Sequence, residues 1–446
     1  MPEPAQSPPA DKLRQAVIVI HGIGEQRPMA TLRGFADGVL GAGPERAGPA
    51  YYSKPDTLSE NFELRCLRTP GNTRPRTDFF EFYWAHLMPV ATWRIVWDWT
   101  KLLLRRRPRD VPARFRVVWI FLWIGLLATA AILVIAAIGQ LMPGLMQGPA
   151  APGELKMPFA VVLAGLGLQG LFLAYVGDAA TYLSPTPRNV AARHAIRSAG
   201  VGLLERLHAS GEYSRIVVVG HSLGSVIGYD VLRYAWHRYH GRHGTPAQPS
   251  RRALEAAEAL GAQLRGEAGA APPFPGERWQ SAVHDVREEL RANGHPWLVT
   301  DFITLGSPLA HADLLLATSG ADLRRQVEQR ELPSAPPVAD ARDSFSVQYR
   351  YDQPDGSKRS TFVPHHAAWT ACVRWTNLYF PSRWLLRGDA VGGPLAPHFG
   401  RGVVDIPVRT RQWGGWLTHT LYWRHDGGDD RLGNPSLRTL CRVLAL

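Results

Sequence analysis

The stretch from Ile216 to Gly224, IVVVGHSLG, constrains the fold more than any other part of the chain. An apolar β-branched run ends abruptly at Gly220, and an apolar, helix-compatible segment begins at Ser225. A strand that becomes a helix within so few residues forces a strained backbone onto the middle residue, Ser222. The glycines two positions to either side lack the Cβ atoms that would otherwise clash. The sequence therefore predicts Ser222 at the tip of a tight strand-to-helix turn.

Such a turn presents the serine hydroxyl as a nucleophile, which favours an acyl-transfer enzyme. The alternative is a surface turn that carries a serine by accident. The hydroxyl of Ser222 is a poor nucleophile at its own pKa, so it needs a basic side chain within hydrogen-bond reach. A third group must in turn hold that base. The motif thus predicts two partners for Ser222 elsewhere in the chain.

Composition limits the other classes of protein. The chain has 446 residues and a formal charge of +12, which would admit nucleic acid or an acidic membrane surface as a partner. We expect no nucleic acid, because zinc-finger spacings and aromatic RNA-binding signatures are absent. Cys66, Cys372 and Cys441 lie too far apart for a disulfide framework or a cysteine-rich metal site, which fits a reducing compartment. The proline-rich residues 1–10 predict a disordered tail and not a signal peptide.

Two long apolar stretches predict membrane spans. Residues 117–138 and residues 158–176 carry no charged side chain, and each is long enough to cross about 30 Å of hydrocarbon as a helix. Buried core helices are the alternative, but soluble helices of this length usually have a polar face. We therefore expect a transmembrane helical hairpin over residues 115–180. It would interrupt one catalytic domain, made of residues 11–114 and 181–446.

Basic residues flank the predicted hairpin on both outer sides. Before the first span lie Arg94, Lys101, Arg105, Arg106, Arg107, Arg109, Arg114 and Arg116; after the second lie Arg188, Arg193 and Arg197. The connecting loop, residues 140–157, has only Glu154 and Lys156. By the positive-inside rule, both ends and the catalytic domain face the cytoplasm of a multi-pass membrane protein. The arginine-rich segment would also attract anionic lipid headgroups.

Strand and helix candidates alternate along the rest of the chain. The predicted strands are residues 16–20, 78–84, 215–219, 298–305, 373–380 and 403–408. The predicted helices are residues 29–40, 190–208, 225–236 and 251–264. This alternation predicts an α/β fold with a mostly parallel sheet wrapped by helices. Residues 241–296 and 331–356 are expected to be solvent-exposed, mobile insertions, and either could form a lid.

The chain resembles the α/β-hydrolase superfamily, specifically its lipase- and esterase-like members. The resemblance rests on Gly220-His221-Ser222-Leu223-Gly224, on VIHGIG over residues 19–24 and on TLGSPL over residues 304–309. It covers most of the chain outside the hairpin and the two insertions. It implies that Ser222 is the nucleophile and that an acid and then a histidine follow it in the chain. The resemblance implies no metal and no organic cofactor.

The family pattern also implies which residues complete the triad. The family acid lies in the loop after a strand downstream of the elbow, which implies Asp389, with Asp405 as the second candidate. The family histidine lies in a loop after the last strand, which implies His419. His398 and His425 are the competing histidines.

Backbone N–H groups form the oxyanion hole in this family. One should come from Leu223, the residue after the nucleophile. Another should come from the loop after the first strand, where Ile23 is the first choice and Gly22 and Gly24 follow it. A phosphate-binding glycine turn is the alternative for this loop, but the G-x-G-x-x-G and P-loop patterns are absent.

The resemblance thus implies a membrane-anchored serine hydrolase of carboxylic esters, with lipid or phospholipid esters as the expected substrates. Thioesters, peptides and small soluble esters stay open, because a fold does not fix a substrate. The competing hypothesis is a non-catalytic membrane scaffold or receptor module on a hydrolase fold. A channel is not expected, since two spans without intramembrane charge offer no ion pathway. His21 and His221 are expected to shape the two turns without taking part in the chemistry.

Overall fold

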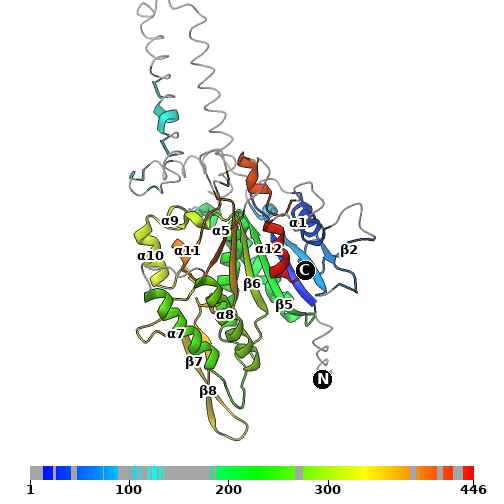
Figure 1. The fold of residues 1–446 in the computed structure, drawn as a ribbon, viewed down its shortest axis with the longest axis vertical. Coiled ribbons are helices and arrows are strands. Elements are labelled where there is room, and N and C mark those ends of the chain that lie inside the picture. Colours follow the sequence, from blue (N-terminus) through cyan, green and yellow to red (C-terminus); the bar gives the residue numbers. More distant parts are fainter. Residues whose placement is uncertain are drawn as a thin grey trace, which may run out of the picture. The chain divides into compact units, whose positions relative to one another are not determined.

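Figure 1 shows the fold in a computed structural model of the chain. The structure describes residues 14–88, 187–266, 275–381, 391–408, 415–424 and 435–446, with short gaps at 24–26, 42–47 and 74; residues 182–183, 388–389 and parts of 101–134 are also described. The chain forms two compact units, which are described separately. The first comprises residues 1–87 and 193–446, and the second comprises residues 88–192.

The first unit is built on an eight-stranded sheet of order β10-β9-β6-β5-β1-β4-β3-β2. Its parallel part consists of β10 (Val404–Pro407), β9 (Arg374–Tyr379), β6 (Val299–Leu305), β5 (Tyr213–His221), β1 (Arg14–Ile20) and β4 (Thr77–Phe82). The edge strands β3 (Arg65–Arg68) and β2 (Tyr52–Pro55) are antiparallel. The predicted α/β fold with a mostly parallel sheet is confirmed.

The apolar runs form the central strands because both faces of the sheet are covered. On one face, α1 (Ala30–Leu40) and α12 (Pro435–Leu444) pack with Val17, Val19 and Val217 of β1 and β5. On the other face lie α6 (Leu223–Tyr239) and α8 (Pro275–Ala292), and a Cβ at Gly228 of α6 would lie 2.9 Å from Phe302 of β6. Burial on both sides explains why these strands lack alternating polar residues.

The predicted strands all form, each within two residues of the expected bounds. The four predicted helices also form, as α1, α5 (Pro187–Ala209), α6 and α7 (Arg252–Gly266). The sequence did not predict β2 and β3. Both are four residues long and carry charged residues or proline, as edge strands often do, so they have no apolar run to detect.

The expectation that residues 241–296 and 331–356 are solvent-exposed is wrong for large parts of both segments, whereas their mobility and lid role stay predictions. Helix α8 buries Trp279, Val283 and Val286, and it packs on β9 and β10. The helical spacing of these residues was hidden among many charged ones. In the second segment, Leu332–Pro337 are buried, and β7 (Ser346–Asp352) forms a hairpin with β8 (Lys358–Pro364).

The second unit contains the predicted hairpin. The described residues between 119 and 134 are helical, whereas residues 158–176 lie outside the described part of the chain. Among the described residues, none of the helices combines the length and the apolar character needed to cross a bilayer. The two membrane spans therefore stay a prediction.

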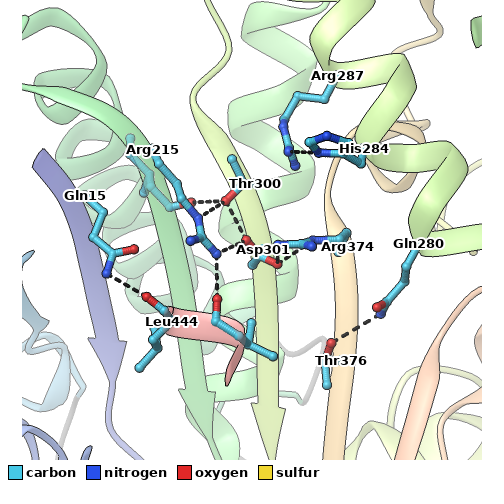
Figure 2. A network of polar contacts seen from close by, with 12 residues as sticks. Gln15, Arg215, Gln280, His284, Arg287, Thr300, Asp301, Arg374, Thr376 and Leu444 are labelled. Atoms are coloured by element: carbon cyan, nitrogen blue, oxygen red, sulfur yellow. Dashed lines mark hydrogen bonds and ion pairs between the residues drawn. The ribbon is translucent and has the colours of Figure 1, made fainter. Parts of the chain in front are cut away.

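Ion pairs fix the amino ends of the parallel strands (Figure 2). The Asp301 carboxylate is bound by Arg215 at 2.7 Å and by Arg374 at 2.7 Å, and it accepts a hydrogen bond from Thr300 at 2.6 Å. Arg215 also donates to the carbonyl oxygen of Val443 at the end of α12. A buried carboxylate with two arginines and a hydroxyl is well compensated for its lost hydration. The network ties β5, β6, β9 and α12 together.

Removing the charge of Asp301 tests this network. We expect Asp301→Asn to lower the free energy of unfolding by roughly 2–3 kcal/mol, because two arginines lose their shared partner. Urea unfolding followed by tryptophan fluorescence measures the change. The matched control is Asp343→Asn, whose side chain is 69% exposed and pairs with Arg265. It should change stability by less than about 0.5 kcal/mol; equal effects of the two substitutions would contradict the assignment.

Candidate active site

The turn between β5 and α6 has the strained geometry that the sequence predicts. Ser222 has φ 51° and ψ −128°, a backbone conformation that L-residues rarely adopt. A Cβ at Gly220 would lie 2.5 Å from the Ser225 Cα, and a Cβ at Gly224 would lie 2.3 Å from the Ile20 carbonyl oxygen. Both positions therefore require glycine, and the turn packs directly against the end of β1.

The side chain of Ser222 is buried at the tip of this turn, with 1% of the residue exposed. Its backbone N–H donates to the Leu305 carbonyl oxygen at 2.9 Å, which fixes the turn to β6. Within the described part of the chain, its Oγ has no hydrogen-bond partner. A buried hydroxyl without a partner is uncommon in folded proteins and calls for an explanation.

Asp389 and His419 form a buried hydrogen-bonded pair. The His419 Nδ1 lies 2.8 Å from the Asp389 Oδ2, and both residues are less than 5% exposed. The Val391 N–H donates to the other carboxylate oxygen at 2.8 Å. Burial by itself raises the pKa of Asp389, but the adjacent His419 and the hydrogen bonds outweigh it and lower the pKa to about 2. Because the carboxylate accepts, the proton of a neutral His419 is assigned to Nδ1, which leaves Nε2 as the basic nitrogen.

Gly306, directly after β6, packs against both residues of this pair. A Cβ at Gly306, where φ is +56°, would lie 2.7 Å from the Asp389 Oδ2 and 2.9 Å from the His419 Cε1. The preceding residue, Leu305, is the one that accepts the Ser222 N–H. The structure therefore places the Asp389–His419 pair next to the residue that follows Leu305, at the carboxyl end of β6, while no hydrogen bond joins the Ser222 Oγ to His419 among the described residues.

His221, next to the nucleophile candidate, links the turn to the histidine loop. Its Nε2 lies 2.8 Å from the His419 carbonyl oxygen, and the two rings lie 4.8 Å apart. Burial and the neighbouring His419 ring lower the pKa of His221 to about 3, so it stays neutral and donates to that carbonyl. The sequence predicted only that His221 shapes its own turn. The contact with His419 was not predicted, because the two residues lie 198 positions apart in the chain.

The first strand ends in a loop that lies against Ser222. A Cβ at Gly22 would lie 2.9 Å from the Ser222 Cβ, so the backbone of this loop needs glycine there. His21 shapes the loop: its ring stacks on Trp84 at 4.8 Å, and burial lowers its pKa to about 4. Ile23 is half-buried in the same loop, whereas Gly24 lies outside the described residues.

Leu223 begins α6, so its N–H is among the first helical amides, which have no partner within the helix. Leu223 directly follows Ser222 in the chain, and Gly22 lies next to Ser222 in space. The role of these amides in an oxyanion hole stays a prediction.

The alternative acid and bases lie in other settings. Asp405, in β10, accepts hydrogen bonds from the Asn377 side chain and from the N–H groups of Leu395 and Ala396, so it caps a short helix. The ring of His398 contacts the Ala310 carbonyl oxygen at 3.1 Å. His425 lies outside the described residues.

Sequence reasoning missed Tyr422, which contacts the same carboxylate. Its hydroxyl donates to the Asp389 Oδ2 at 2.7 Å. The signal was present as an aromatic residue three positions after His419, in the apolar run WLTHTLYW. No spacing rule, however, distinguishes a tyrosine that bonds a carboxylate from one that fills the core.

A cavity of about 530 Å³ lies elsewhere, at the carboxyl end of β4. Phe62, Glu81, Tyr83, His86 and Leu203 are among its lining residues, whereas the three triad candidates are not. Within the described part of the chain, acidic, cysteine and histidine side chains form no group of three that could hold a metal ion.

Comparisons with known protein families, curated proteins and solved structures find no match to this chain.

The close fit at Gly306 gives a test of the site geometry. We expect Gly306→Ala to lower the free energy of unfolding by roughly 1–3 kcal/mol more than Gly356→Ala. Both glycines have positive φ, so both substitutions strain the backbone, but no atom lies within 4 Å of a Cβ at Gly356. Urea unfolding of the two variants separates steric overlap from backbone strain. Equal losses of stability would contradict the close packing of Asp389 and His419 on Gly306.

Proposed function

We propose that the chain is a membrane-anchored serine hydrolase of the α/β-hydrolase type that cleaves carboxylic esters. The observation that carries the proposal is the buried Asp389–His419 hydrogen bond packed beside the strained turn of Ser222. The parallel sheet with the elbow after a central strand agrees with that fold type. The family assignment itself rests on the motifs, because a mixed α/β sheet is shared by many folds.

In the proposed mechanism, the Nε2 of His419 takes the proton of Ser222 as the hydroxyl oxygen attacks the acyl carbon. Asp389 holds the imidazole in the required tautomer and stabilises its charged form. The N–H groups of Leu223 and of Ile23 or Gly22 bind the oxyanion. His419 then gives its proton to the leaving alcohol, and a water molecule, activated in the same way, releases the acid from the acyl-enzyme. No cofactor is needed for these steps.

A lipid substrate is proposed because of the second unit. Ile120, Ile124, Leu127 and Val134 lie in helical residues, and each is between 47% and 61% exposed. Their spacings of four, three and seven residues are those expected for one face of an α-helix. An exposed apolar face of this kind favours contact with a membrane or another apolar surface. The proposed spans would anchor the catalytic unit in the cytoplasm at the bilayer surface, where acyl esters are concentrated.

The proposed reaction is tested by hydrolysis of a substrate panel. We expect the purified full chain in detergent micelles to hydrolyse at least one of phosphatidylcholine, phosphatidylglycerol, diacylglycerol and p-nitrophenyl butyrate. Ser222→Ala should lower that rate by roughly 10³-fold or more, because the nucleophile is lost. Ser198→Ala, at an exposed position of α5, is the matched control and should keep the rate.

A fluorophosphonate probe separates the enzyme from the scaffold hypothesis. Labelling that disappears in Ser222→Ala supports the enzyme. A folded wild-type protein that neither reacts with the probe nor cleaves any ester of the panel would favour the non-catalytic scaffold or receptor.

The proposed topology has its own test. Gly148→Cys places a thiol in the loop between the proposed spans, and we expect it to react with a membrane-impermeant maleimide in intact cells. The wild-type chain is the control for background labelling, because Cys66 and Cys372 are buried but Cys441 is only half-buried. Protection of the new thiol from the impermeant reagent, with labelling by a permeable one, would overturn the orientation.

A further inference from the structure

Tyr422 contacts the Asp389 carboxylate, and its hydroxyl makes two hydrogen bonds. Its hydroxyl donates to the Asp389 Oδ2 at 2.7 Å and accepts from the Phe380 N–H at 3.2 Å. The residue is fully buried, and its ring packs on Phe380 with centroids 4.6 Å apart. The hydroxyl therefore has one donor and one acceptor, both in direct contact with it.

The proton of this hydroxyl points to the carboxylate at every working pH. Burial, followed by the charge of Asp389, raises the pKa of Tyr422 well above its ordinary value. The phenol thus stays protonated, and because the Phe380 N–H can only donate, the phenol proton goes to Asp389. The tyrosine is a permanent donor to the carboxylate.

Two donors consequently share one carboxylate oxygen. The Asp389 Oδ2 accepts from both His419 Nδ1 and Tyr422, while the Oδ1 accepts from the Val391 N–H. These donors hinder rotation of the carboxylate about its Cβ–Cγ bond. A donor on Oδ2 also withdraws negative charge from the atom that faces His419, so the carboxylate stabilises a charged imidazole less strongly.

We propose that Tyr422 is a positioning residue, which holds Asp389 in line with His419 and limits how strongly the carboxylate retains a proton on that histidine. This inference rests on the proposed function for its kinetic consequences. A triad histidine must accept the proton of the nucleophile and then release it to the leaving group. A carboxylate that held this proton too strongly would slow its release. A mobile carboxylate would no longer keep the proton of the neutral histidine on Nδ1.

Removal of one hydroxyl tests the proposal. For Tyr422→Phe in the full chain, we expect kcat/KM on p-nitrophenyl butyrate to fall roughly tenfold or more. We also expect the acid limb of its pH profile to move up by about half a pH unit or more. The direction follows from charge: without the tyrosine donor, Asp389 holds the proton on His419 more strongly, so activity is lost at a higher pH.

Tyr229→Phe is the matched control. Tyr229 is also fully buried, and its hydroxyl donates to the Pro333 carbonyl oxygen at 2.8 Å, away from the triad candidates. It should lower stability without moving the acid limb. An unchanged acid limb in Tyr422→Phe would overturn the proposal. So would loss of the fold in Tyr422→Phe alone, because the hydroxyl would then serve the fold and not the site.

Nuclear magnetic resonance separates this proposal from the proposed function. The chain is labelled with ¹⁵N-histidine, and the His419 signals are identified by their absence in His419→Gln. The pH at which these signals change should be higher in Tyr422→Phe than in the wild type and in Tyr229→Phe. That result without any ester hydrolysis would support the positioning role and remove the function. Identical titrations in all three proteins would overturn the positioning role, whether or not the protein is active.

Discussion

The close packing of the β5–α6 turn on the end of β1 is the constraint on which the rest of the site depends. A Cβ at Gly224 would overlap the Ile20 carbonyl oxygen, and a Cβ at Gly220 would overlap the start of α6. With both glycines in place, the chain changes from strand to helix within a few residues. Ser222 adopts a strained backbone conformation with positive φ. This turn places the serine at the carboxyl edge of the sheet. Asp389 follows β9 and His419 follows β10, and both pack on Gly306 at the end of β6.

The two edges of the sheet use buried carboxylates in different ways. At the amino ends of the strands, Asp301 is bound by two arginines. A guanidinium group does not exchange protons in catalysis, so this carboxylate serves stability. At the carboxyl ends, Asp389 instead has a histidine and a tyrosine as partners, and histidine is the side chain that most often transfers protons in catalysis. The same residue type therefore ties strands together at one edge and is suited to proton transfer at the other.

The sequence predicted those parts of the fold that have a local cause. The strand that leads to Ser222 is an unbroken apolar run, and both glycines are required by the turn that contains them. Asp389 and His419 followed from family chain order and strand placement, and the structure puts them in contact. Tyr422 and the His221–His419 contact were not predictable, because they depend on side chains meeting across elements far apart in sequence. Helix α8 was missed for a different reason: its apolar residues are separated by many charged ones, which hide their helical spacing.

The central claim is that the Ser222 hydroxyl reacts with acyl carbons with the help of His419. An experimental structure of the full chain after treatment with an alkyl fluorophosphonate tests this most directly. The account predicts phosphorus bonded to the Ser222 Oγ, the His419 Nε2 within about 3 Å of an oxygen on the adduct, and Asp389 still bound to Nδ1. A phosphonate on another side chain, or an adduct on Ser222 with His419 and Asp389 separated from each other, would contradict it.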